Sequence, residues 1–308
     1  MKTLGKLLLV PLLTLNITFS VLTIFSCYVS QMPPFGKWPF ASLSGLAFPY
    51  LACTMLIFFL IWLLVWRKGI IVPLATCLIC MGPIHEFTPL HLRGKNPPAN
   101  ARTLCVMTYN TMGFGTVMNN DRSAANPVVQ VAVSSGADII CMQEALPSNL
   151  NDFTGGKGVF KEYPYISSGQ GMTGQTVVSK YPIIESSTEL FENSTGNSYQ
   201  HVLIKLGADT LSVYNCHFQS NHMDQTNLED YNKILHNPSD TSNFEGMKKI
   251  LKKLLDSTKL RAQQAELISQ MASQDSHRYV IVCGDFNDSP LSYSHRVFSR
   301  RLTDVYGK

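Results

Sequence analysis

Two long uncharged hydrophobic runs near the N-terminus most constrain how this chain can fold. The first covers residues 7–29 and the second covers residues 43–66, which are 23 and 24 residues without a formal charge. A helix needs about 20 apolar residues to cross the hydrocarbon core of a bilayer. We therefore expect both runs to be transmembrane helices. A signal peptide does not explain the first run, because its apolar part is too long and no small-residue cleavage site follows it.

A third hydrophobic run, residues 69–84, is shorter and contains Pro73. Its 16 residues fall below the length of an ordinary span, so it is either a short third transmembrane helix or a re-entrant segment. We expect a helix that crosses.

Basic residues flank the first two runs and predict the orientation of the chain. Lys2 and Lys6 precede the first run, and Arg67 and Lys68 follow the second. Positive charge collects on the cytoplasmic side of membrane helices, so both of these ends are expected in the cytoplasm. A third run that crosses then places the remainder outside the cytoplasm, and one that does not leaves it inside. We expect the extracytoplasmic arrangement, although basic residues at positions 93, 95 and 102 oppose it.

The formal charge of the chain is divided between two parts. Residues 1–100 carry seven basic and one acidic side chain, whereas the remainder has 18 basic and 20 acidic side chains. The positive balance therefore belongs to the hydrophobic part and indicates membrane topology, not a nucleic-acid surface on a folded domain.

Residues 96–100, Asn-Pro-Pro-Ala-Asn, have the composition of a linker. The predicted organisation is a membrane anchor over residues 1–95, a linker over 96–102 and a second domain over 103–308.

Four apolar segments of the second domain each end in a polar side chain that can bind a metal or move a proton. They are residues 103–111 with Asn110, 137–145 with Glu144, 210–221 with His217, and 279–288 with Asp285 and Asn287. Short apolar runs rich in β-branched residues are typical of buried strands. Helical segments are expected between them, at 127–135 and 260–273. The sequence therefore predicts an α/β (α+β) domain whose strands deliver one polar cluster to one edge.

The cysteines of this domain give no metal pattern. Cys105, Cys141, Cys216 and Cys283 lie in or beside apolar strand-like runs, so we expect buried free thiols.

The four motifs in this order resemble the endonuclease/exonuclease/phosphatase superfamily, which includes deoxyribonuclease I. The most specific of them is Gly-Asp-Phe-Asn at 284–287, followed by Pro290. The resemblance covers about residues 103–306. It implies two packed β-sheets flanked by helices, and hydrolysis of a phosphoester with Mg²⁺ or Mn²⁺.

The resemblance implies that Glu144 and Asn110 hold the metal. A hard carboxylate at a strand end suits Mg²⁺, which takes one or two carboxylates and keeps several waters. Asn110 is similar to the family's metal-shell asparagine, whose amide oxygen could be a ligand while its NH₂ group touches phosphate.

Three further residues receive catalytic roles from the same resemblance. Asp285 resembles the residue that orients or deprotonates the attacking water. Asn287 resembles the one that donates to the developing oxyanion. His217, in Asn-Cys-His, resembles the first family histidine and is expected to contact phosphate.

Two more residues are expected to support the site. Asp288 is ambiguous, and a loop-capping carboxylate is favoured over a catalytic one. Arg261 begins a segment similar to the family's Arg-x-x-Gln-Ala helix, where it could buttress the site loops, or it is an exposed helix arginine.

Just before Arg261, residues 246–259 form a basic amphipathic pattern that could lie on anionic lipid or over the site, although ordinary packing on the domain is favoured.

The resemblance also implies a C-terminal segment that this sequence does not contain. Family domains continue past the segment that residues 302–304 resemble and close with a strand bearing an Asp-His or Asp-Tyr pair. The sequence ends at Lys308. We therefore expect the domain to be incomplete at its C-terminus and the sequence to be a fragment of a longer protein.

Together these features predict a membrane-tethered, divalent-metal-dependent hydrolase of phosphoesters, with no protein partner inferred. Its partners would be the lipid bilayer and a lipid, small-molecule or nucleic-acid phosphoester. The alternative is a non-catalytic membrane protein, or an inactive fragment, that keeps the fold for binding.

Overall fold

The structure is a computed structural model of the whole chain. It describes residues 2–90, 101, 103–114, 126–145, 160–169, 174–192, 194, 196–221, 225–236 and 244–306. The chain divides into two compact units, one with residues 1–94, 221–266 and 288–308 and the other with residues 95–220 and 267–287. Most of the predicted linker, residues 96–102, lies outside the described residues.

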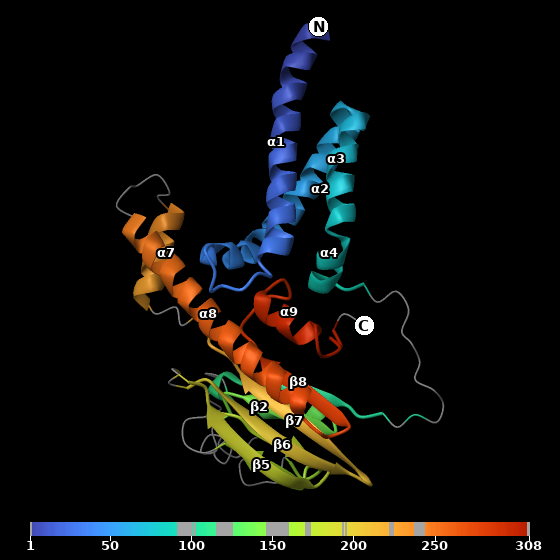
Figure 1. Cartoon of the computed structure of the whole chain (residues 1–308), viewed down its shortest axis with the longest axis vertical. Helices are drawn as coiled ribbons and strands as arrows, with labels where there is room; N and C mark the ends of the chain where they lie inside the picture. The colour runs from blue at the N-terminus through green and yellow to red at the C-terminus, as the bar shows by residue number, and fades with distance from the viewer. Residues whose placement is uncertain are drawn as a thin grey trace. The chain divides into compact units, whose positions relative to one another are not determined.

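The hydrophobic runs of the first unit are helical (Figure 1). In chain order the helices are α1 (Lys2–Val29), η1 (Pro39–Ala47), α2 (Phe48–Val65), η2 (Arg67–Ile70), α3 (Ile71–Ile79) and α4 (Met81–Phe87). Within the part of the chain that the structure describes, two segments are long and apolar enough to cross a membrane, Leu9–Val29 and Pro39–Val65. The third run is split, because the segments Arg67–Ile79 and Met81–Phe87 meet at a bend of 63°. That bend fits either a broken span or a re-entrant loop, so the choice made from sequence stays a prediction.

One buried polar contact fixes how α1 meets α2. Trp62 Nε1 donates to Asn16 Oδ1 at 2.9 Å, and both side chains are fully buried. A polar group in an apolar helix pair is tolerated when it is hydrogen-bonded, so this contact specifies the pairing of the two helices.

Among its described residues the second unit contains two four-stranded sheets, and two packed sheets are what the family resemblance implied. Sheet A has the order β1 (Val106–Asn110), β2 (Ile139–Gln143), β4 (Thr176–Ser179), β3 (Tyr165–Ser168). Sheet B has the order β5 (Ile183–Leu190), β6 (Ser198–Leu206), β7 (Asp209–His217), β8 (Tyr279–Asp285). Their inner faces pack together, since Ile139, Cys141 and Val177 of sheet A share a buried cluster with Val202 and Val213 of sheet B.

Strand register brings the polar strand ends together. β1 and β2 are parallel, with Asn110 paired to Gln143. β7 and β8 are also parallel, with His217 paired to Asp285. Because the carboxyl ends of parallel strands meet at one edge, each sheet presents two of the predicted motifs side by side.

The helices of the C-terminal half differ in part from the prediction. Helix α5 (Pro127–Ser134) agrees with it, and α7 (Gln225–His236) and α9 (Tyr293–Ser299) lie in segments for which no element was predicted. The two segments predicted at 246–259 and 260–273 form one continuous 31-residue helix, α8 (Phe244–Gln274). No proline or glycine interrupts residues 247–274. Its buried residues include Ile250, Leu255, Ala262, Ala265 and Ile268.

The cysteine prediction is correct in part. All of the cysteines are free, and Cys141 and Cys216 are buried. Cys105 is exposed and Cys283 is half-buried. Cys105 precedes the first residue of β1, and β8 is an edge strand of its sheet, so neither position has a covering element on every side.

Candidate active site

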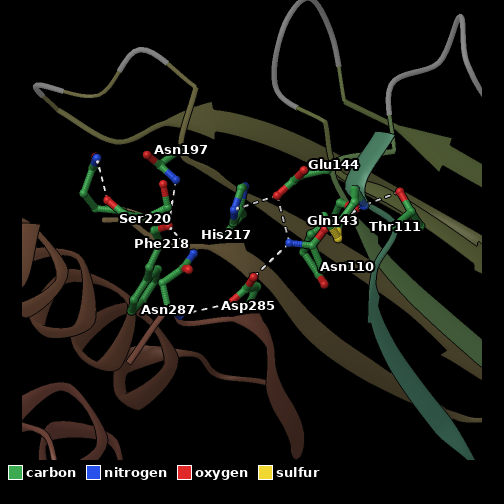
Figure 2. A network of polar contacts seen from close by, with 12 residues as sticks. Asn110, Thr111, Gln143, Glu144, Asn197, His217, Phe218, Ser220, Asp285 and Asn287 are labelled. Carbon is green, nitrogen blue, oxygen red and sulfur yellow. Dashed lines mark hydrogen bonds and ion pairs between the residues drawn. The ribbon is translucent and has the colours of Figure 1, made fainter. Parts of the chain in front are cut away.

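Asn110 lies between the two predicted acidic residues of the site (Figure 2). Its Nδ2 donates to Glu144 Oε1 at 2.9 Å and to Asp285 Oδ2 at 2.8 Å. Asn110 ends β1 and Glu144 follows β2, both in sheet A, whereas Asp285 ends β8 of sheet B. One amide therefore joins carboxylates that belong to the two sheets. The amide oxygen accepts from Met112 N at 2.9 Å. In this orientation the oxygen does not face the two carboxylates, whereas the predicted role as a metal ligand requires that it does.

The backbone of Glu144 has an unusual conformation, which sets the direction of its carboxylate. Its φ is +54°, in the left-handed region that non-glycine residues rarely adopt, at a cost of about 1–3 kcal/mol. The neighbouring Gly174 leaves room for this turn: a Cβ there would lie 3.1 Å from Glu144 Cα. Gly174 O accepts from Ala145 N at 2.6 Å and secures the residue after Glu144. Strain of this kind persists only where surrounding contacts enforce it, and it is common at functional sites.

His217 faces the same carboxylate from sheet B. Its Nε2 lies 3.6 Å from Glu144 Oε1 (Figure 2). The Glu144 side chain is 41% exposed and that of His217 is 13% exposed. The carboxylate is thus accessible to water while the imidazole lies beside it.

Asp285 and Asn287 are held together by the turn that follows β8. Asn287 N donates to Asp285 Oδ1 at 2.9 Å, and Asn287 has φ of +51°. Asp285 therefore accepts one hydrogen bond on each oxygen, from Asn287 and from Asn110. Gly284 makes the turn possible, because its φ is +141° and a Cβ there would collide with the backbone of Cys216 on β7.

The carbonyl of Phe218 anchors two asparagine amides. It accepts from Asn287 Nδ2 at 3.0 Å and from Asn197 Nδ2 at 2.7 Å. An NH₂ group carries two hydrogens, so the contact with Phe218 uses one of those of Asn287. Asn197 was missed in the sequence, where it ends a Ser-Thr-Gly-Asn stretch with no strand motif to mark it.

A buried polar pair behind the site was also missed. Gln143 Nε2 donates to Asn215 Oδ1 at 2.6 Å and to Thr108 Oγ1 at 3.1 Å. Asn215 Nδ2 in turn donates to Met142 O at 3.0 Å. Both amide side chains are fully buried or nearly so. Alternation along β7 was the available signal, because Asn215 and His217 lie two residues apart and share a face.

The two predicted supporting residues lie in the first unit and pair with each other. Arg261 Nε is 3.5 Å from Asp288 Oδ2, and its other nitrogens donate to Asn221 Oδ1 and Thr258 Oγ1, both at 2.9 Å. Arg261 is buried, which rules out the exposed-arginine alternative. Burial lowers the pKa of its guanidinium, and the Asp288 carboxylate opposes that shift. Asp288 Oδ1 accepts from Ser289 N at 2.9 Å within the loop.

The residues of the site fit a small divalent cation. Among the described residues, no group of three or more His, Cys, Asp or Glu side chains could hold a metal ion. Mg²⁺ and Mn²⁺ do not require such a group, because Mg²⁺ is usually bound by one or two carboxylates and completes its shell with water and substrate oxygens. Glu144 and Asp285 supply two carboxylates around one amide, and the exposure of Glu144 leaves space for water.

The sequence model described as the endonuclease/exonuclease/phosphatase family matches residues 107–304, and a domain family of unknown function matches residues 6–87. No curated protein matches the chain. The chain belongs to the endonuclease/exonuclease/phosphatase family. This family groups hydrolases of phosphoester bonds.

Several solved structures are similar to the chain. Beta toxin from Staphylococcus aureus with bound magnesium ions has a TM-score of 0.45 and 19% identity, over 66% of this chain and 71% of that one. Sphingomyelinase C from Streptomyces griseocarneus has a TM-score of 0.43 and 18% identity, over 65% and 70%. TDP2 from D. rerio in complex with a single-stranded DNA product has a TM-score of 0.42 and 15% identity, over 63% and 64%.

Proposed function

We propose that this chain is a membrane-tethered phosphodiesterase that depends on Mg²⁺ or Mn²⁺. The observation that carries the proposal is the bridge from Asn110 Nδ2 to the carboxylates of Glu144 and Asp285. It gathers two acidic groups from separate sheets at one point, where their mutual repulsion favours a bound cation. When bound, the ion would polarise the phosphoryl oxygens and favour ionisation of a water molecule.

Asp285 is the group that would orient the attacking water and accept its proton. Both of its oxygens are held, by Asn287 N and by Asn110 Nδ2, so the carboxylate has a fixed direction. A general base must lie within one hydrogen bond of the proton it takes, and a fixed carboxylate meets that demand without reorganisation.

Asn287 and His217 would stabilise the negative charge that develops on the phosphoryl oxygens. Asn287 is fixed through Phe218 O and keeps a second amide hydrogen to donate. His217 faces the site from the end of β7 and would donate from its imidazole. Donors that are already in place act at no cost of reorganisation as charge forms. The C-terminal Asp-His or Asp-Tyr pair that the family resemblance implies stays a prediction.

Hydrolysis of a soluble chromogenic diester, bis(p-nitrophenyl) phosphate, by the purified full chain tests the proposal. Turnover should be lost with EDTA and restored by Mg²⁺ or Mn²⁺. Glu144→Gln should lower kcat/KM at least about 100-fold and weaken Mn²⁺ binding measured by electron paramagnetic resonance. Glu185→Gln, at an exposed position of β5, is the matched control and should change neither quantity. Turnover that survives EDTA, or Glu144→Gln with unchanged turnover, contradicts the proposal. Ligand binding without any turnover would support the non-catalytic alternative.

The membrane part of the proposal rests on the helical runs that could span a bilayer. A tethered enzyme meets substrates at the bilayer surface, which favours a lipid or small phosphodiester. Residues 101–308 carry a small negative balance, which disfavours a long polyanion. Comparing a phosphodiester lipid in vesicles with single-stranded DNA tests this, and faster cleavage of the DNA would reject the lipid preference. Protease protection in sealed vesicles tests the proposed extracytoplasmic side.

A further inference from the structure

The N-terminal helices bind the loop that follows Asn287 by packing around Leu291. We propose that residues 6–87 are more than a tether: they form a clamp that binds the segment 288–294 and so belong to the folded hydrolase. The packing part of this inference stands without the proposed function, and only its effect on catalysis rests on it.

Leu291 is a core residue of the helical unit. It is fully buried in one cluster with Cys27 of α1, Phe48 of α2 and Cys80, where α3 gives way to α4. Partly buried residues of the same helices complete its surroundings: Ile24, Ala52, Ile84 and Phe87. Burying a leucine side chain corresponds to about 10- to 100-fold in an association constant. Three separate parts of the anchor therefore converge on one side chain of the loop.

The backbone of Leu291 is bound at the same place. Ser30 Oγ lies 2.6 Å from Leu291 O and 2.7 Å from Ser26 O, and Ser30 has no exposed surface. Gly45 permits this close approach, because a Cβ there would lie 3.0 Å from Ser30 Cβ and 3.4 Å from Leu291 O. A hydrogen bond to a buried carbonyl is specific in direction, so the loop is held in one position and not merely covered by apolar surface.

The receiving surface is tied together by the anchor's own contacts. Tyr28 OH donates to Ile79 O at 2.6 Å, joining α1 to α3. Ser26 Oγ donates to Ser44 O at 2.8 Å, joining α1 to η1. These bonds link the elements that surround Leu291 to one another, so the clamp is a built surface.

The other end of the loop is fixed to α8 and α9. Asp288 Oδ2 accepts from Ser294 Oγ at 2.7 Å and lies 3.5 Å from Arg261 Nε. Tyr293 OH donates to Glu266 Oε1 at 2.6 Å. The segment from Asp288 to Ser294 thus has fixed points at both ends and at Leu291 between them.

Chain connectivity passes this restraint to the site. Leu291 is four residues after Asn287, and an extended chain spans at most about 3.6 Å per residue, so their Cα atoms are within about 14 Å. Leu291 and Ser30 are therefore positioning residues, which act on Asn287 through the backbone and touch no substrate.

Cleavage of the linker separates a clamp from a tether. A specific protease site is placed between Pro98 and Ala99 of the full chain, which carries an affinity tag at its N-terminus and is purified in mild detergent. After cleavage the tagged anchor is captured, and the presence of the 99–308 fragment is measured. We expect the fragment to be retained, because its Leu291 binds the anchor non-covalently, in part through Ser30 of the anchor. A fragment that flows through overturns the clamp, whatever the chain's catalytic activity.

Variants in the clamp test which residues hold the fragment. Leu291→Asp should lower retention at least about tenfold by placing a charge in an apolar cluster. Val305→Asp adds the same charge in the same unit at a side chain that is 87% exposed, and it should retain the fragment. Equal retention by both variants overturns the assignment.

A milder variant keeps the test valid if Leu291→Asp does not fold. Ser30→Ala should weaken the association about fivefold through the loss of one hydrogen bond. Ser42→Ala, which removes a local bond to Pro39 O, should have no effect. In the intact chain, Ser30→Ala should lower kcat on the soluble diester with KM nearly unchanged, because it shifts Asn287 without removing a substrate contact. Unchanged kcat would overturn the positioning role and leave the retention result standing.

Discussion

Gln143 Nε2 lies 2.6 Å from Asn215 Oδ1, and this buried contact joins sheet A to sheet B. Gln143 immediately precedes Glu144, and Asn215 lies two residues before His217. The contact therefore sets the distance between β2, which precedes Glu144, and β7, which ends at His217. A buried polar pair of this kind accepts few geometries, and it specifies one register between two otherwise apolar faces.

Removing one partner of this pair should cost stability. Gln143→Leu and Asn215→Leu should each lower the free energy of unfolding by about 1–3 kcal/mol, because each leaves a buried amide unsatisfied. The double variant should lose less than the sum, with a coupling of about 0.5–3 kcal/mol. Pulse proteolysis across a urea series measures these values, and Gln263→Leu on the exposed face of α8 is the control. Additive losses would show that the pair is not coupled.

Asn110 should matter through the two carboxylates that it joins. Asn110→Ala removes the hydrogen bonds to Glu144 and Asp285 and leaves them to repel each other. We expect kcat to fall about 10- to 100-fold, the usual cost of losing a residue that orients metal ligands. Steady-state hydrolysis of the soluble diester measures the change. Asn232→Ala, at an exposed position of α7, should leave kcat unchanged. Equal rates for both variants would remove Asn110 from the site.

Two glycines allow steric overlap to be separated from backbone strain. Gly207→Ala should cost about 1–2 kcal/mol, because its φ is +68° but a Cβ would meet nothing within 4 Å. Gly284→Ala should cost about 3 kcal/mol or more, because its φ of +141° is also strained for an L residue and a Cβ would in addition collide with the Cys216 backbone. Urea unfolding of both variants provides the comparison. If the two losses are equal, β7 and β8 do not approach each other at Gly284 as closely as described.

Asp275 should govern the acid stability of the second unit. Burial opposes its ionisation, but hydrogen bonds from Ser212, Tyr214 and His277 outweigh it and lower the pKa to about 2. A carboxylate whose folded pKa is depressed stabilises the fold above its unfolded pKa of about 3.9, and this stability is lost as pH falls towards 2.

Asp275→Asn should therefore lower stability at pH 7 by about 2–3 kcal/mol and flatten its pH dependence between about 4 and 2. Unfolding measured at a series of pH values tests this, with the exposed Asp209→Asn as control. His201 adds a separate loss, because burial lowers its pKa and protonation below about 6.5 then favours the unfolded chain. A steep acid limb that persists in Asp275→Asn would assign that limb to other groups.

Local sequence alone predicted the elements that carry the site. The strands ending at Asn110, Glu144, His217 and Asp285 were predicted because apolar β-branched runs and the polar residues that end them are properties of adjacent residues. The helical runs of the anchor were predicted for the same reason, since length and absence of charge are local. Within each sheet the meeting of two strand ends also followed, because parallel neighbours place like ends at one edge.

Tertiary structure decided which partners the side chains at those positions contact. Gln143 meets Asn215 from 72 residues away, and Ser30 meets Leu291 from 261 residues away. No local pattern encodes such contacts, because they depend on how sheets and helices stack after they form. The same is true of the direction of the Asn110 amide, which two carboxylates from separate sheets fix. Periodicity and residue chemistry thus determined the elements and the kinds of group at their ends, whereas packing between distant segments determined their partners.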